Sequence, residues 1–268
     1  SEIACVECGE VKVFKNYKNE ECTPSAVRID EKGAVIVGRK AYDRHVDDPT
    51  NTVIEFKRWM GSSSVMEFKA SGKKLNAEEL SAEVLKELKA TAKAKLADDE
   101  DISAAVITVP CNFNATQCEA TQRAAHLAGI KYAPLLQEPI AASIAYGFLE
   151  KMPQGYWAVY DLGGGTFDIA IMSAKDGRLS VVDHCGDNHL GGKDIDWKIV
   201  EHVIYPILRE EYFLPELGRG NKEYASLNAV LKKSAEELKI ELSHSVVADI
   251  VIYTGGSRIS DKNGKVRS

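Results

Sequence analysis

The first forty residues alternate loosely between apolar and polar side chains, a pattern typical of half-buried strands. Apolar residues on both sides of Gly9 predict a hairpin over residues 3–14. A second pair of strands is predicted at residues 25–29 and 34–37, joined by a turn that ends at Gly33. We therefore expect the chain to begin inside a sheet.

Helical periodicity follows, and two of the helices begin at a capping signal. Asn76 with Glu79 has the spacing of a capping box, in which two side chains satisfy backbone N–H groups at the helix start, and so has Asn114 with Gln117. Buried strands alternate with these helices, and this alternation predicts an α/β lobe. The predicted helices are 76–96, 114–129 and 138–146, and the predicted strands are 104–110 and 132–136.

The second half of the chain opens with three strands and continues with two long helices. A Pro-Gly-containing stretch after residue 152 separates the halves. We expect a first lobe over residues 1–152 and a second, partial lobe over 153–268, in which residues 186–268 form an outer subdomain. The predicted elements are strands 157–161, 167–173 and 179–184, helices 194–213 and 222–243, and a last strand 246–253.

Composition and charge narrow the class of protein. With 44% apolar and 28% charged residues, the chain of 268 residues is expected to be globular. The formal net charge of −6 and the lack of a basic patch argue against a nucleic-acid partner. No apolar run reaches the length of a membrane span, and no secretion signal is visible, so we expect a cytoplasmic protein without membrane contact.

Residues 161–168, Asp-Leu-Gly-Gly-Gly-Thr-Phe-Asp, carry the candidate chemistry. Three consecutive glycines weaken a strand pair, and they are explained if another group approaches the backbone closely. Their N–H groups and the Thr166 hydroxyl suit a phosphate, and carboxylates beside a phosphate suit Mg²⁺, which keeps several waters. A tight hairpin with two solvent-facing aspartates is the alternative.

Two charged residues elsewhere are further candidates, each with an ordinary alternative. Lys57 and its neighbour Arg58 lie in a short amphipathic segment and point either to solvent or into a phosphate site. Glu138 stands where a strand meets a helix, at the edge where open α/β sheets bind ligands. It also suits the helix N-terminus as a favourable charge, so both interpretations remain open.

Five stretches in order, 51–61, 107–110, 138–147, 161–168 and 189–192, resemble the nucleotide-binding domain of the heat-shock 70-kilodalton (DnaK-like) chaperone family. The resemblance implies an actin-like ATPase fold, two α/β lobes with ATP in the cleft between them. It also implies a stress-response chaperone that assists protein folding by hydrolysing ATP. Its partners would be a J-domain co-chaperone and a nucleotide-exchange factor, and client peptides would bind only through a domain outside this chain.

The resemblance also implies roles for particular residues. Asp161 and Asp168 would hold Mg²⁺ through water, Lys57 would position the attacking water, and Glu138 would support this network. The catalytic set would be Lys57, Glu138, Asp161 and Thr166, and the phosphates of ATP or ADP would lie against Gly163, Gly164, Gly165 and Thr166.

On the adenosine side, the family pattern matches Glu236, Lys239 and Ser243, which lie on one face of a helix at i, i+3 and i+7. Ile240 departs from this pattern, because the family usually has an arginine there that stacks on the base. The family's first phosphate loop, part of the segment between Gly61 and Lys73, and the late part of the second lobe are also missing from the sequence. The chain is therefore expected to be incomplete at both ends, and a non-hydrolysing nucleotide-binding or interaction fragment is the competing hypothesis.

Overall fold

Short strands form several small sheets. The computed structural model describes residues 1–96, 101–146, 155–252, 259–263 and 265–267, and within them neighbouring strands are antiparallel except in the β8–β9 pair. The strands are β1 (Ala4–Glu7), β2 (Glu10–Val13), β3 (Ala26–Ile29), β4 (Val35–Val37), β5 (Thr52–Ile54), β6 (Val65–Glu67), β7 (Lys74–Asn76), β8 (Ile107–Val109), β9 (Leu135–Gln137), β10 (Gly155–Leu162), β11 (Phe167–Lys175), β12 (Arg178–Asp187), β13 (Tyr212–Phe213), β14 (Ile259–Asp261) and β15 (Val266–Arg267).

Helices connect and cover these sheets. The α-helices are α1 (Arg39–Arg44), α2 (Ala77–Lys93), α3 (Ala115–Leu127), α4 (Glu138–Ala145), α5 (Gly192–Ile199), α6 (Tyr205–Glu211) and α7 (Ala225–Glu241). Two single turns of 3₁₀-helix, η1 (Phe56–Trp59) and η3 (Lys222–Tyr224), and the π-helical turn η2 (Val200–Ile204) complete the set.

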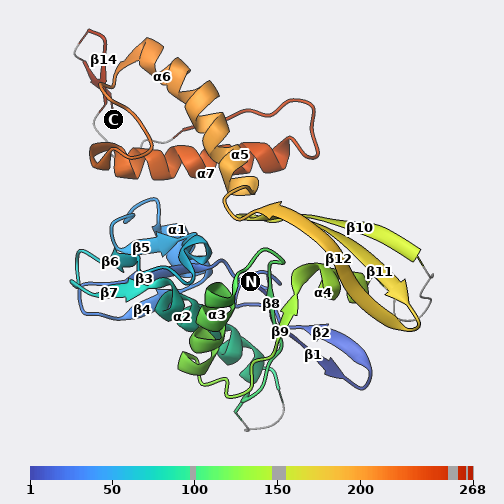
Figure 1. The fold of residues 1–268 in the computed structure, drawn as a ribbon. Coiled ribbons are helices and arrows are strands. Elements are labelled where there is room, and N and C mark those ends of the chain that lie inside the picture. Colours follow the sequence, from blue (N-terminus) through green and yellow to red (C-terminus); the bar gives the residue numbers. More distant parts are fainter. Residues whose placement is uncertain (97–100, 147–154, 253–258, 264, 268) are drawn as a thin grey trace.

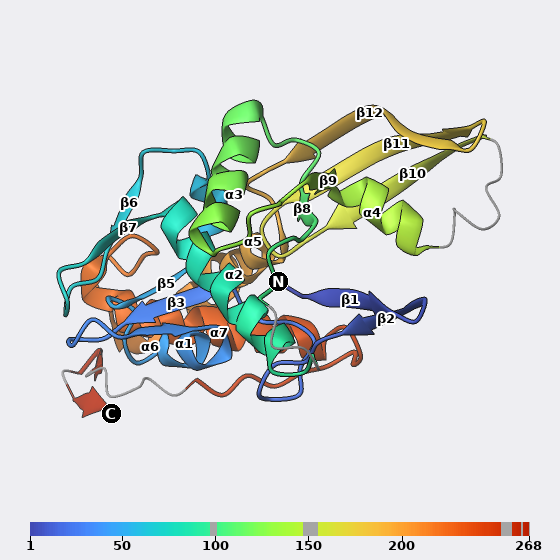
Figure 2. The same ribbon diagram turned by 90° about the horizontal axis from the view of Figure 1, so that it is seen from below.

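The elements gather in three groups (Figure 1). Helices α5, α6 and α7 lie together at one end, and the sheet β10–β11–β12 with α4 extends to the side. The third group is centred on the sheet β4–β3–β5 and on helices α2 and α3, whereas β14 lies with α6 in the first group. The β1–β2 hairpin projects on the same side as the β10–β12 sheet, as Figure 2 also shows.

The sequence signals for turns and helix starts are confirmed. The β1–β2 and β3–β4 hairpins form around Gly9 and Gly33, which both have positive φ. Asn76 and Asn114 each accept a hydrogen bond from the backbone of the residue three positions on, and Glu79 and Gln117 bond back to the capping backbone. These contacts satisfy N–H groups that the first helical turn leaves unpaired.

Two predicted elements need correction. The helix predicted over 194–213 is interrupted at η2, and α6 starts again with Pro206 in its first turn. Proline cannot donate a backbone hydrogen bond, so the preceding turn widens instead of continuing as an α-helix. The strand predicted over 246–253 is wrong for residues 246–252, which pair with no strand in the described chain, and residue 253 lies outside that part.

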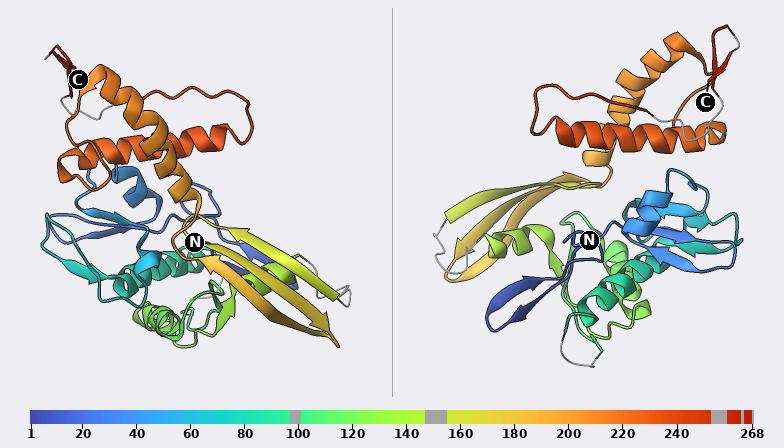
Figure 3. Two further views of the ribbon diagram at one scale, coloured as in Figure 1. Left: turned by 45° about the horizontal axis from the view of Figure 1, so that its top comes forward. Right: turned by 180° about the vertical axis from the view of Figure 1, so that it is seen from behind.

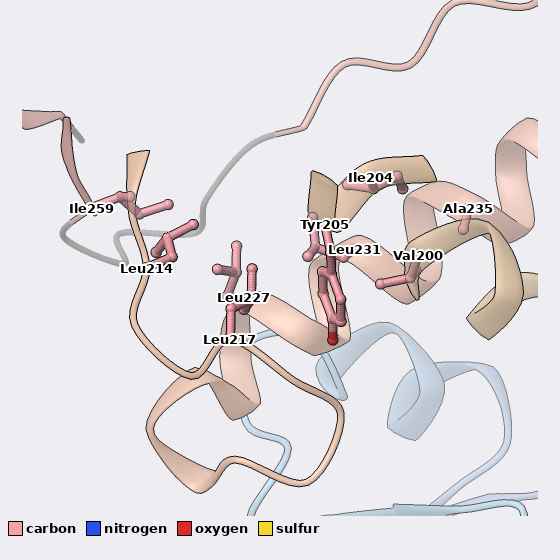
Figure 4. Packing of buried hydrophobic residues seen from close by; sticks show 9 residues of the cluster. All are labelled: Val200, Ile204, Tyr205, Leu214, Leu217, Leu227, Leu231, Ala235 and Ile259. Atoms are coloured by element: carbon pink, nitrogen blue, oxygen red, sulfur yellow. The ribbon is translucent and has the colours of Figure 1, made fainter. Parts of the chain in front are cut away.

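The largest hydrophobic cluster holds α5, η2, α6 and α7 together. Leu227, Leu231 and Ala235 form the buried stripe of α7, and Val200 and Tyr205 pack against it (Figure 4). Ile259 of β14 reaches the same cluster. This packing fixes α7 relative to α5, and the start of α5 lies beside the glycine turn.

A second cluster joins α4 to the sheet β10–β11–β12. Ile140 of α4 and Cys111 pack against Ala170 and Met172 of β11 and against Trp157 of β10. The predicted boundary between lobes falls among residues 147–154, outside the described residues, and stays a prediction. Among the helices that the structure describes, none is long and apolar enough to cross a membrane.

Candidate functional site

The two aspartates of the glycine-rich stretch lie opposite each other in the sheet. Asp161 of β10 is the register partner of Asp168 of β11, so both side chains project on one face. That face also carries Trp157 and Met172, which pack against α4. Because α4 begins at Glu138, the first turn of α4 lies at the end of the sheet where the aspartates are.

The turn between these strands is held by the first residues of α5. Gly192 N–H donates to Gly163 O at 3.0 Å, and Lys193 N–H donates to Gly164 O at 3.1 Å. Within the turn, Gly163 N–H donates to Thr166 O at 2.9 Å. The N–H groups of Gly164 and Gly165 donate to no other residue in the part of the chain that the structure describes. They are the donors left for an anion.

Gly191 is needed for this contact because of its size. A Cβ atom on Gly191 would lie 2.5 Å from the backbone N of Gly165 and 2.6 Å from the carbonyl C of Gly164. Its own φ of −175° is ordinary extended backbone. Close approach of two backbones, and not strain, therefore requires glycine here.

We expect Gly191→Ala to displace the turn and to lower the free energy of unfolding by about 1–3 kcal/mol, the usual cost of overpacking. Urea denaturation measures the change. Gly218→Ala is the matched control, because a Cβ there would meet only Glu216 O at 3.8 Å. Equal stability of the two variants would contradict the packing described for Gly191.

Asp168 is the buried member of the carboxylate pair. Its residue exposure is 2%, and its Oδ1 atom is buried without a hydrogen-bond partner in the described residues. Burial raises the pKa of Asp168, and the nearby charges of Glu138 and Asp161 raise it further, whereas a backbone bond from Asn112 and the charge of Lys57 oppose the shift. A buried carboxylate oxygen without a partner is what a cation or its water would satisfy.

Lys57 and Glu138, separated by 81 residues, form an ion pair across this site. Lys57 Nζ lies 2.9 Å from Glu138 Oε1 and also stands over the ring of Phe113, 5.8 Å from its centre. Lys57 lies in η1 and Glu138 at the start of α4, so two separate elements supply the pair. Since both charges also act on the Asp168 carboxyl, the structure brings the predicted residues Lys57, Glu138, Asp161 and Asp168 together.

Arg58 also lies close to the glycine turn. Its guanidinium makes two hydrogen bonds to the Asp194 carboxylate, one of them 3.0 Å long, and its Nε lies 3.6 Å from where a Cβ of Gly165 would stand. This pair raises the pKa of Arg58. The sequence left the direction of Arg58 open, and it did not indicate Asp194, because the two residues are 136 positions apart.

The residues predicted for the adenosine side lie on and just after α7. Lys239 Nζ donates to Gly192 O at 2.9 Å and pairs with the fully buried Asp196. Glu236 accepts a hydrogen bond from the Tyr42 hydroxyl of α1, where α7 faces the β4–β3–β5 group (Figure 3). Ser243 lies two residues beyond the end of α7, and its hydroxyl donates to Lys239 O at 3.2 Å.

These contacts connect α7 with the turn. Lys239 bonds to the carbonyl of Gly192, whose N–H bonds to Gly163. Sequence reasoning missed Asp196 and Tyr42, which are distant in the chain from the residues they contact. The neighbouring Gly191 and Gly192 did carry a signal, as part of the stretch 189–192.

A metal site made of protein groups alone is not present in the described residues, where no three His, Cys, Asp or Glu side chains converge suitably. Asp161 and Asp168 supply carboxylates, and water would have to supply the other ligands. Mg²⁺ accepts such a site, because it usually keeps several waters and touches one or two carboxylates.

A comparison with protein families shows which family the chain belongs to. The family model described as Hsp70 protein matches residues 1–65 and 62–265 of the chain. The chain belongs to the Hsp70 family. Its mixed α/β structure accordingly is the actin-like ATPase fold, as expected from the sequence. Hsp70 proteins are chaperone ATPases that generally bind ATP or ADP with Mg²⁺ and work with co-chaperones.

Proposed function

We propose that this Hsp70 chain binds ATP or ADP with Mg²⁺ at the 163–166 turn and hydrolyses ATP there. One observation carries the proposal: four charged groups from four different elements converge at the turn end of the β10–β12 sheet. Asp161 and Asp168 come from paired strands, Glu138 from α4 and Lys57 from η1. A hairpin with solvent-facing aspartates would not bury Asp168.

The phosphates would lie against the backbone of the turn. Gly164 and Gly165 offer N–H groups that have no acceptor among the described residues, and Thr166 adds its hydroxyl. Gly163 helps indirectly, because its own N–H closes the turn. Asp161 and Asp168 would hold Mg²⁺ through water, and the bound ion neutralises charge on the phosphate oxygens.

Lys57 is assigned the role of positioning the attacking water. In phosphoryl transfer the protein contributes mainly position and charge, and a lysine supplies both. Glu138, 2.9 Å away, keeps the Lys57 ammonium at the site and adds a carboxylate that accepts hydrogen bonds from water.

The ribose and base of the nucleotide are assigned to the α7 side of the site, where they would contact Glu236, Lys239 and Ser243.

The test measures binding and turnover separately on the whole chain. Calorimetry with ADP and Mg²⁺ reports binding, and single-turnover assays with ATP report hydrolysis. Binding together with hydrolysis supports the proposal. A chain that binds no nucleotide at millimolar concentration contradicts it.

A second candidate function is nucleotide binding without turnover. The exposed Ile240 favours it, since this residue is 54% exposed on α7 where the family pattern has a base-stacking arginine. The same measurements separate the two functions, because a binding module retains ADP affinity and shows no hydrolysis above the uncatalysed rate.

Asp161→Asn is expected to weaken the dependence of nucleotide binding on Mg²⁺, because the variant lacks one of two negative charges that face the ion. We expect about a tenfold loss of ADP affinity with Mg²⁺, roughly 1.4 kcal/mol, and little change without it. Asp176→Asn, at the far turn of the same sheet, is the control. If ADP affinity is indifferent to Mg²⁺ in the wild type and in both variants, the metal assignment is wrong.

The chain is further proposed to serve protein folding through this ATPase, as a cytoplasmic chaperone. A J-domain co-chaperone and a nucleotide-exchange factor are the proposed partners, and a separate domain would bind client peptides. Stimulation of single-turnover hydrolysis by a purified J-domain is the direct test.

A further inference from the structure

Two lysines share one carboxylate beside the glycine turn. Lys232 Nζ lies 3.1 Å from Glu55 Oε1, and Lys193 Nζ lies 3.9 Å from the same atom. The side chains of Glu55 and Lys232 are only 12% and 5% exposed, and that of Lys193 is 27% exposed. One negative charge therefore faces two positive charges in a largely buried place.

Glu55 is more closely paired with Lys232 than with Lys193. Lys232 projects from the buried part of α7, where an ammonium needs a close counter-charge. The Lys193 contact, at 3.9 Å, is too long for a hydrogen bond. The carboxylate of Glu236 also acts on Lys193, but it already accepts a bond from Tyr42, and Arg58 adds another positive charge nearby. Lys193 is thus a cation with weak partners.

The Lys193 side chain runs along the turn that we assign to phosphate. The backbone N–H of Lys193 donates to Gly164 O, and the Cε atom of its side chain lies 3.9 Å from where a Cβ of Gly164 would stand. Only the last atoms of the side chain need to turn for the ammonium to leave Glu55 and approach an anion on Gly164 and Gly165. Burial lowers the pKa of Lys193, so an arriving anion would also relieve a poorly solvated charge.

We propose that Lys193 is a phosphate-binding residue of this chain, moving from Glu55 to the phosphates of a bound nucleotide while Lys232 keeps Glu55 neutralised. The inference rests on the proposed function, because it takes the 163–166 turn as the phosphate site. It adds a cation from the start of α5 to the N–H groups of the turn, whereas Lys57 of η1 stays assigned to the attacking water.

The experiment compares ligands with and without phosphate on Lys193→Met. ADP and adenosine compete against a fluorescent ADP, with Mg²⁺ present, on wild type and variant. We expect the variant to lose about 10-fold to 100-fold in ADP affinity, the range of one charge-assisted hydrogen bond, and to keep its adenosine affinity. Lys193→Arg should restore most of the ADP affinity. Lys198→Met, an exposed lysine of the same helix, is the control and should change neither.

Each other outcome has a definite meaning. Unchanged ADP affinity in Lys193→Met overturns this inference alone. The proposed function still stands in that case, because the wild-type chain binds ADP. An equal loss for ADP and adenosine also overturns it, because it assigns Lys193 a structural role. A wild-type chain that binds no ADP overturns both proposals together.

Discussion

Replacing Lys57 with alanine is expected to slow single-turnover ATP hydrolysis by about 10²–10³-fold, the usual loss for one electrostatic stabiliser at a reacting centre. ADP affinity should change little, because the phosphates would be held by the turn and the ion. The structural basis is the position of the Lys57 ammonium, 2.9 Å from Glu138 and within the field that acts on Asp168. Rapid-quench assays measure this step directly when the protein is in excess of ATP and its concentration is above the dissociation constant for ATP.

The matched control for this prediction is Lys69→Ala, which removes an exposed lysine that follows β6. It should leave both rate and affinity unchanged. An unchanged hydrolysis rate in Lys57→Ala would contradict the role of Lys57. Loss of ADP binding in that variant would instead assign Lys57 to binding in the ground state.

Glu55→Gln is expected to destabilise the fold by about 3–5 kcal/mol, the usual cost of leaving a buried charge without its partner. Glu55 stands before η1 in a left-handed conformation, and its carboxylate neutralises the buried Lys232 of α7. Glutamine keeps the size but not the charge, so the Lys232 ammonium would remain buried and unpaired. Urea denaturation of wild type and variant at neutral pH gives the difference.

The pH dependence of this difference has a definite sign. Burial opposes ionisation of Glu55, but Lys193 and Lys232 outweigh it, so the pKa of Glu55 is below its ordinary value of 4.5. The contribution of Glu55 to stability is therefore complete above pH 4.5 and is lost as the pH falls through the lower, folded-state pKa. Wild type and variant should converge in stability at acid pH.

Glu67→Gln is the control, because Glu67 pairs with Lys74 at the surface, where both side chains are more than half exposed. Such surface pairs contribute about 0–1 kcal/mol. A Glu55→Gln variant that is no less stable than Glu67→Gln would show that the Lys232 charge is not buried as described.

Local signals were sufficient for much of the fold. The capping boxes at Asn76 and Asn114 and the turns at Gly9 and Gly33 depend on contacts within a few residues, and all are present. The strand predicted over 246–253 depended on an apolar pattern alone. A strand also needs a neighbour for its backbone groups, and within the described chain residues 246–252 have none.

The chain sequence by itself determined the family, the two carboxylates that face each other, and the glycine turn between them. These follow from short motifs, since residues seven apart on two strands of a tight hairpin are brought opposite by the hairpin itself. Apart from Lys57, which the family resemblance indicated, it could not determine which cations reach that turn. Lys57, Arg58 and Lys193 meet the site only because η1 and α5 pack beside it, and Glu55 meets Lys232 across 177 positions of the chain. Contacts between residues so distant leave no periodic pattern, because they are selected by the packing of whole elements, and only the tertiary structure decides them.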